Sequence, residues 1–130
     1  MMPPDENRRA LIPTRPAPPH EPDCLVLFVQ ALTLRALAGA EAQAELRFTL
    51  VPDERFVGAE GLDAYLALIS GFAWPSAEEA AHAMLEDFNE RLQPRYAEIV
   101  LDIITESGRR LAVMSRRKPG WDNFAVLTRG

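Results

Sequence analysis

The apolar residues of this chain change their spacing twice along the sequence, and this limits the possible folds more than any other feature. They alternate with polar residues between positions 44 and 51, recur every three or four positions between 62 and 92, and alternate again between 96 and 105. Alternation indicates a β-strand with one buried face, whereas the longer period indicates an amphipathic helix. The sequence therefore predicts helices bracketed by strands.

Apolar runs, turns and caps set the limits of the predicted elements. The apolar run from Cys24 to Leu34 predicts a first strand, and the stretch from Ala44 to Val51 predicts a second. Ser76 followed by Glu79 forms a capping box that begins the second of two helices, and Pro94 ends that helix. Tyr65 falls on the apolar stripe of the first helix, so we expect it in the core.

The C-terminal third predicts a hairpin. Tyr96 to Thr105 forms one strand, Ser107-Gly108 the turn, and Arg109 to Ser115 the returning strand, while Phe124 to Leu127 has strand-like character. The element order is then strand, strand, helix, helix, strand, strand. This order predicts an α+β fold in which a four-stranded antiparallel sheet carries both helices on one face.

A proline-rich leader (residues 1–22) precedes this fold. It holds 7 of the 11 prolines of the chain, which remove backbone donors, so we expect an extended or disordered arm. At 130 residues in total, the remaining positions 23–130 predict a single domain.

Composition and charge exclude several classes of function. The net charge of −5 argues against nucleic-acid binding, and no apolar run is long enough to span a membrane. One cysteine and two histidines cannot form a Cys/His zinc cage within one chain, so we predict no metal site. The leader lacks the apolar core of a signal peptide, and we therefore expect a cytoplasmic protein.

We expect the sheet face opposite the helices to be apolar. By strand alternation it would carry five residues, Val26, Phe28, Val51, Val100 and Ile104. An exposed patch of this kind is uncommon on a small monomer. The chain is therefore predicted to form a homo-oligomer that buries the patch, or a mixed assembly with a second subunit of the same fold.

Four short runs of the sequence carry a resemblance to a known family. They are Val51-Pro52-Asp53-Glu54-Arg55, Leu62 with Tyr65-Leu66, Leu92 with Pro94-Arg95-Tyr96, and Lys118-Pro119-Gly120-Trp121. These runs resemble the V-P-D-E-R, L-K-L-Y-L, L-x-P-R-[YW] and G-K-P-G patterns of the 7-cyano-7-deazaguanine reductases of queuosine biosynthesis, which have the tunnelling fold (T-fold), and the resemblance covers roughly positions 35–120. The resemblance implies a T-fold subunit that assembles into a ring or barrel.

The residues that the resemblance assigns to nitrile reduction are missing. Counting back from Val51 places Arg35 where the family has its nucleophilic cysteine, and Ala42 where it has an acid. A guanidinium cannot attack a nitrile carbon, and an alanine cannot deliver a proton. Cys24 precedes the first strand, far in sequence from the matching position. We therefore expect no catalytic residue of the family's kind.

The family's cationic run for NADPH is also absent. The corresponding segment, Gly58 to Asp63, carries two acids where the family has lysines, and Glu106 replaces the arginine of a later turn. Acids at these positions would repel the phosphates of NADPH. We accordingly expect no cofactor and no NADPH-dependent nitrile reduction.

One binding feature of the fold is retained. T-fold enzymes anchor a purine or pterin ring on an acid near the start of the second helix, and the resemblance places Glu78 there. The placement of one gap decides between Glu78 and Glu79. Both acids would also favour a helix N-terminus without any ligand. His82, one turn beyond Glu78, is a weaker ligand-binding candidate, and Arg35 could meet an anionic ligand or pair with Glu41.

Three functions remain open from the sequence. The leading one is a non-reducing T-fold protein that binds a purine-like ring, of the guanine or deazaguanine type, or serves as a scaffold subunit. The second is an enzyme of different chemistry on a related purine or pterin heterocycle. The third is an NADPH-dependent 7-cyano-7-deazaguanine reductase with a rearranged site.

Overall fold

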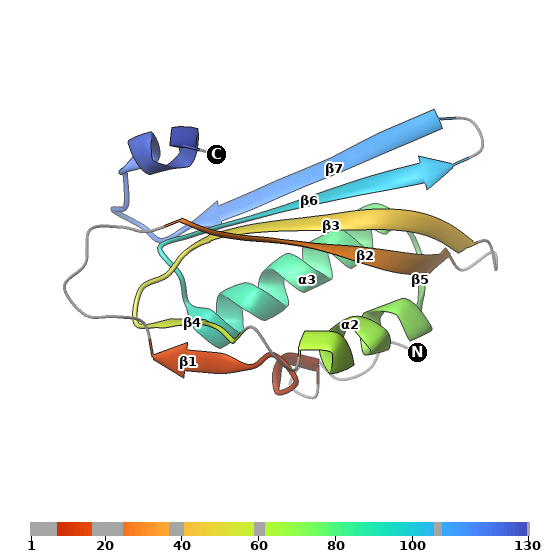
Figure 1. Ribbon diagram of the computed structural model, residues 1–130, viewed down its shortest axis with the longest axis horizontal. Coiled ribbons are helices and arrows are strands. Elements are labelled where there is room, and N and C mark those ends of the chain that lie inside the picture. Colours follow the sequence, from red (N-terminus) through yellow and green to blue (C-terminus); the bar gives the residue numbers. More distant parts are fainter. Residues whose placement is uncertain (1–7, 17–24, 37–40, 59–61, 106–107, 130) are drawn as a thin grey trace.

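The computed structural model describes residues 8–16, 25–36, 41–58, 62–105 and 108–129. Its main body is a sheet covered on one face by two helices (Figure 1). The strands of this sheet are β2 (Val26–Ala36), β3 (Glu41–Val51), β5 (Ala73–Trp74), β6 (Tyr96–Thr105) and β7 (Gly108–Arg117). The helices are α2 (Leu62–Gly71) and α3 (Ala77–Leu92). The predicted α+β class and the predicted helical layer are confirmed.

The sheet differs from the prediction in size and type. Its order is β5-β2-β3-β6-β7, and four of these strands pair antiparallel as expected. The fifth, β5, pairs parallel to β2 through Arg35 and Ala36. The sheet is therefore five-stranded and mixed, because two of the five residues between α2 and α3, Ala73 and Trp74, pair with the edge of β2.

Residues 8–16 of the predicted leader pack on the fold and do not form a free arm. Residues Thr14–Pro16 form β1, which pairs antiparallel with β4 (Arg55–Val57), and Ile12 is fully buried. The Arg91 Nε donates to the Ile12 carbonyl oxygen at 3.1 Å, and the Gly58 amide donates to that of Pro13 at 2.9 Å. Residues 8–16 are thus docked on the fold, because their backbone groups and apolar side chains find partners there.

Aromatic side chains join the sheet to the helices. The ring centroids of Phe48 on β3 and Phe88 on α3 lie 4.2 Å apart, and Phe28 on β2 stacks on Phe48 at 5.3 Å. Tyr65 on α2 meets Phe88 edge-on at 5.5 Å. Such pairs add to the stability gained by burying apolar area, and this cluster fixes both helices against the same sheet face. Tyr65 lies in the core, as predicted.

The C-terminal segment is a 3-10 helix, Phe124–Arg129, so the predicted strand-like stretch there is wrong. Trp121 packs on Tyr96 with ring centroids 5.5 Å apart and meets Phe124 at 5.5 Å. The Arg117 guanidinium lies 5.2 Å from the centre of the Phe124 ring. These contacts hold the segment beside the end of β7 without any strand pairing.

The sheet face away from the helices carries exposed apolar side chains together with ion pairs such as Arg47–Glu45, and its apolar members differ from the prediction. Ile104 is 52% exposed there and Val100 is half-buried, but Val51 is fully buried. Val26 and Phe28 pack against the core on the helix side. We call the exposed set the outer apolar face: Leu27, Val29, Ile104, Leu111 and Val113.

No helix among the residues described has both the length and the apolar character needed to cross a membrane.

Candidate functional site

Helix α3 begins with the predicted cap. Ser76 has an extended backbone (φ −156°, ψ 162°), and its side-chain oxygen accepts a hydrogen bond from the Glu79 amide at 3.2 Å. The Ala80 amide donates to the Ser76 carbonyl oxygen at 3.2 Å, which closes the first turn. The cap satisfies donors that are otherwise orphaned at a helix start. It therefore fixes the position of Glu78.

A cavity of about 450 Å³ lies where this first turn crosses the hairpin of β6 and β7. Its lining comes from both elements. The helix contributes Ser76, Ala77 and Glu78, β6 contributes Ile103, and β7 contributes Gly108, Arg109 and Arg110. Glu79 is not among the described lining residues, so Glu78 is the acid that faces the cavity.

Arg110 reaches this cavity because of strand register. It pairs with Ile103, whose side chain is only 5% exposed on the helix-facing side of the sheet. Residues opposite each other in a sheet share a face. The Arg110 side chain therefore points towards α3, where its guanidinium forms an ion pair with the Glu78 carboxylate.

The Glu78–Arg110 pair is open to solvent. The side chains are 42% and 63% exposed, respectively. Exposed ion pairs of this kind contribute about 0–1 kcal/mol to stability, because water screens them and long side chains lose entropy. A ligand can therefore replace either partner of this ion pair at a small cost in free energy.

Arg109, the neighbour of Arg110, is turned to the other side of the sheet. Its Nε donates to Asp102 Oδ1 at 3.3 Å, and its Nη2 also bonds the same carboxylate. This hydrogen bonding raises the pKa of the Arg109 guanidinium, with a further contribution from the charge of Asp102. Of the two arginines, Arg110 is the one that meets Glu78.

The other predicted site residues do not join Glu78. Arg35 lies near the end of β2, opposite Glu41 in register, and its Nη1 donates to the Gly71 carbonyl oxygen at 3.4 Å. His82 is exposed one turn further along α3. Neither is among the described residues that line the cavity. Cys24 lies outside the described residues.

The described part of the chain contains no cluster of side chains that could hold a metal ion. No group of three or more His, Cys, Asp or Glu side chains comes together there.

The family-like runs come together at the opposite end of the sheet. Asp53 accepts hydrogen bonds from Arg95 at 3.3 Å and from Lys118 Nζ at 2.6 Å. The Arg95 amide donates to the Val51 carbonyl oxygen, and the Lys118 amide donates to that of Arg95. The Lys118 hydrogen bond is the main reason that the pKa of Asp53 is lowered, against a smaller opposing effect of burial. We call Asp53, Arg95 and Lys118 the joint; it ties the ends of three strands together.

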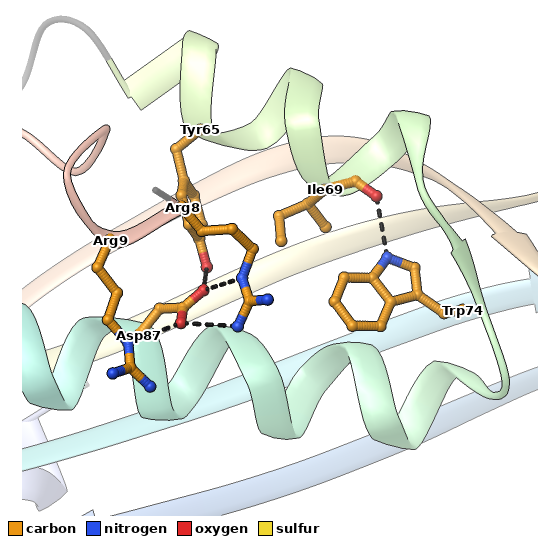
Figure 2. Close-up of polar contacts among 6 residues, drawn as sticks. All are labelled: Arg8, Arg9, Tyr65, Ile69, Trp74 and Asp87. Atoms are coloured by element: carbon orange, nitrogen blue, oxygen red, sulfur yellow. Dashed lines mark hydrogen bonds and ion pairs between the residues drawn. The ribbon is translucent and has the colours of Figure 1, made fainter. Parts of the chain in front are cut away.

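A buried ionic cluster is the largest polar feature that sequence reasoning missed (Figure 2). Asp87 on α3 is 0% exposed and accepts hydrogen bonds from Arg8 Nε at 2.9 Å, Arg8 Nη2 at 3.0 Å and Arg9 Nε at 3.0 Å. The Tyr65 hydroxyl also donates to it at 2.7 Å. Burial, followed by the Asp87 charge, raises the pKa of Tyr65 well above 10.0.

One sequence signal could have found this cluster. Asp87 lies three positions after Met84 and one before Phe88, on the apolar stripe of the helix. A buried acid requires a charged or hydrogen-bonding partner. The two adjacent arginines of the leader supply it.

Comparison with known proteins identifies a related fold. No protein-family model matches the chain, and no curated protein sequence matches it. Among solved structures, the crystal structure of the archaeosine synthase QueF-Like in the apo form matches with a TM-score of 0.60 at 12% sequence identity. The match covers 73% of this chain and 95% of that chain. This protein therefore has a QueF-like fold.

Proposed function

We propose that this chain is a non-reducing member of the T-fold group that binds a purine-like ring, of the guanine or deazaguanine type, as a binding or scaffold subunit. The observation that carries the proposal is Glu78. Its carboxylate lies in the first turn of α3 and lines a cavity of about 450 Å³. A carboxylate can accept both ring N–H and amino donors of a guanine-type edge.

The fold supports the same assignment. A QueF-like fold is shared with an archaeosine synthase, and the resemblance of the sequence to deazaguanine reductases places the ring anchor at Glu78. The absence of reductase chemistry rests on sequence, since Arg35 stands at the position of the family's nucleophile. Its guanidinium contacts the Gly71 carbonyl oxygen, which suits a structural role.

We further propose that the outer apolar face is covered by other subunits. Leu111 and Val113 are 62% and 58% exposed on β7, and Leu27 is 51% exposed on β2. Burying apolar area contributes about 25 cal/mol per Å². A second copy of this chain or another T-fold subunit would gain this energy.

Calorimetry with guanine and 7-deazaguanine tests the ring-binding proposal. Glu78→Gln keeps the shape of the side chain but replaces one acceptor by a donor, so we expect the affinity to fall about 10- to 100-fold, as for a charge-assisted hydrogen bond. Glu79→Gln is the matched control, because Glu79 is exposed and outside the described cavity lining. Equal affinity in wild type and Glu78→Gln would refute the anchor.

Consumption of NADPH tests the absence of reductase activity. With 7-cyano-7-deazaguanine as substrate we expect no oxidation of NADPH above the rate without protein. Turnover that persists in a Cys24→Ala variant would contradict the proposal, since it would require a nucleophile other than the one thiol of the chain.

A further inference from the structure

We infer that Arg110 determines which ring the Glu78 site accepts, by donating a hydrogen bond to the 6-oxo oxygen of a guanine-type ring. The inference rests on the proposed ring-binding function and names a second residue of the same site. It starts from the ion pair between Arg110 and Glu78, because two groups that touch in the free protein also lie within reach of one small ligand.

The edge of a guanine-type ring presents three groups in a row: the 2-amino donor, the N1–H donor and the 6-oxo acceptor. A carboxylate has only acceptors and satisfies the first two groups, whereas a guanidinium has only donors and satisfies the third. Glu78 and Arg110 side by side therefore complement all three positions. Adenine, which has no 2-amino group and no 6-oxo oxygen, does not fit this arrangement.

Other polar side chains of the cavity are already engaged. The Ser76 oxygen accepts the Glu79 amide as the helix cap, and the Arg109 guanidinium is bound to Asp102 on the other side of the sheet. Among the described lining residues, Arg110 is thus the side-chain donor that lies against Glu78.

The freedom of the Arg110 side chain makes the exchange feasible. Its backbone is held in β7 opposite Ile103, while the side chain is 63% exposed. The guanidinium can therefore leave the carboxylate for the neighbouring ring oxygen without any backbone movement. Because it stays beside Glu78, the two charges remain balanced when the ring excludes water from the cavity.

Three purines separate the two roles: guanine, 2,6-diaminopurine and hypoxanthine. Replacing the 6-oxo group by an amino group in 2,6-diaminopurine puts a donor against Arg110 and also removes the N1–H. Hypoxanthine lacks only the 2-amino group that Glu78 would accept. Calorimetric affinities for these rings are measured for wild type, Arg110→Ala, Glu78→Gln and Arg116→Ala, with circular dichroism to show that each variant is folded.

For wild type we expect guanine to bind about 100-fold or more tightly than 2,6-diaminopurine, because the hydrogen bonds to both Arg110 and Glu78 are lost, at about tenfold each. Arg110→Ala should bring this ratio down about tenfold and leave the guanine-to-hypoxanthine ratio unchanged. Glu78→Gln should reduce the guanine-to-hypoxanthine ratio. Arg116→Ala is the control and should keep both ratios of the wild type, because Arg116 pairs with Glu86 on α3 and is not among the described lining residues.

Two outcomes would overturn the inference in distinguishable ways. In the first, wild type binds guanine through Glu78, but Arg110→Ala keeps the guanine-to-diaminopurine ratio or strengthens binding of all three rings alike. Arg110 is then only a competitor for the carboxylate, so the inference is wrong while the proposed function stands. If wild type binds none of the rings, both are wrong.

Discussion

Replacing Arg8 by methionine would remove the main partner of a buried carboxylate. The Arg8 guanidinium donates from Nε and Nη2 to the two Asp87 oxygens at 2.9 and 3.0 Å. The side chains are 3% and 0% exposed, so water cannot replace these hydrogen bonds. Methionine retains much of the apolar stem of arginine and fills the same space without a charge.

The expected cost follows from what remains around Asp87. Breaking a buried ion pair by removing one partner costs about 3–5 kcal/mol, because the remaining charge is left uncompensated. Arg9 and Tyr65 still donate to Asp87, at 3.0 and 2.7 Å, which favours the lower end of this range. We expect Arg8→Met to lower the free energy of unfolding by about 3 kcal/mol, a large part of the ~5–15 kcal/mol of a typical domain.

A double-mutant cycle would show that the loss comes from the pair. Removing both partners of a buried pair is often close to neutral, so Arg8→Met combined with Asp87→Leu should cost less than the sum of the single changes. Arg9 can then turn towards water, because its side chain is 27% exposed. The coupling free energy should exceed about 1.5 kcal/mol for residues in direct contact.

The assay is urea unfolding, monitored by tryptophan fluorescence, to which the buried Trp74 and also Trp121 contribute. Arg47→Met is the control, since Arg47 pairs with Glu45 on the surface with side chains 54% and 46% exposed, and it should cost at most about 1 kcal/mol. If Arg8→Met changed stability no more than Arg47→Met, the docking of residues 8–16 on α2 and α3 would be refuted.

Two further predictions concern pH and assembly. The pKa of Tyr65 is raised mainly by burial, so above about pH 10 the unfolded chain releases a proton that the folded chain retains; stability should then fall as pH rises. Urea unfolding on either side of pH 10 should show this decline in stability, and Tyr65→Phe should remove most of it. If stability fell with pH equally steeply in Tyr65→Phe and in wild type, the burial of the phenol would be contradicted. Val113→Glu places a charge on the outer apolar face, so light scattering should show a smaller particle than for wild type. The control is His82→Gln on the exposed side of α3, which should not alter the particle mass. Equal masses for wild type and Val113→Glu would argue against this interface.

Elements with strong local signals were predictable from sequence. The strand Tyr96–Thr105 has the limits that its alternation predicts, and α3 begins directly after Ser76 because the cap and the periodicity agree. β5 has two residues, and β1 and β4 have three each. Such short strands exist only because a partner edge lies beside them, and no pattern of so few residues can show this.

The first strand shows why an unbroken apolar run is ambiguous. Residues 25–29 are all apolar, so alternation cannot decide which of them face the helices. Phe28 packs on Phe48 in the core, while Leu27 and Val29 remain exposed. A register shift of one residue exchanges the two faces of a strand. The prediction therefore placed Ile104 on the outer face correctly but assigned Val26 and Phe28 to it wrongly.

The candidate site was predictable in one of its two parts. Glu78 follows from the cap and from the resemblance to a known family. Arg110 belongs to a strand that the sequence does predict, but its approach to Glu78 depends on the packing of α3 across β6 and β7. Only the register that sets Arg110 opposite Ile103 turns its side chain towards the helix. No local pattern encodes that contact.

The two ends of the sheet carry different kinds of information. At one end the joint of Asp53, Arg95 and Lys118 gathers residues from three of the runs that resemble the reductase family, and their contacts with one another stabilise the ends of β3, β6 and β7. At the other end the Glu78 cavity meets Arg110, which belongs to none of those runs. Likeness in the joint therefore reflects the fold, because those side chains hold strands together. The proposed ring binding therefore rests on Glu78 and Arg110, where a carboxylate and a guanidinium would offer acceptors and donors to a ligand and no thiol is among the described lining residues.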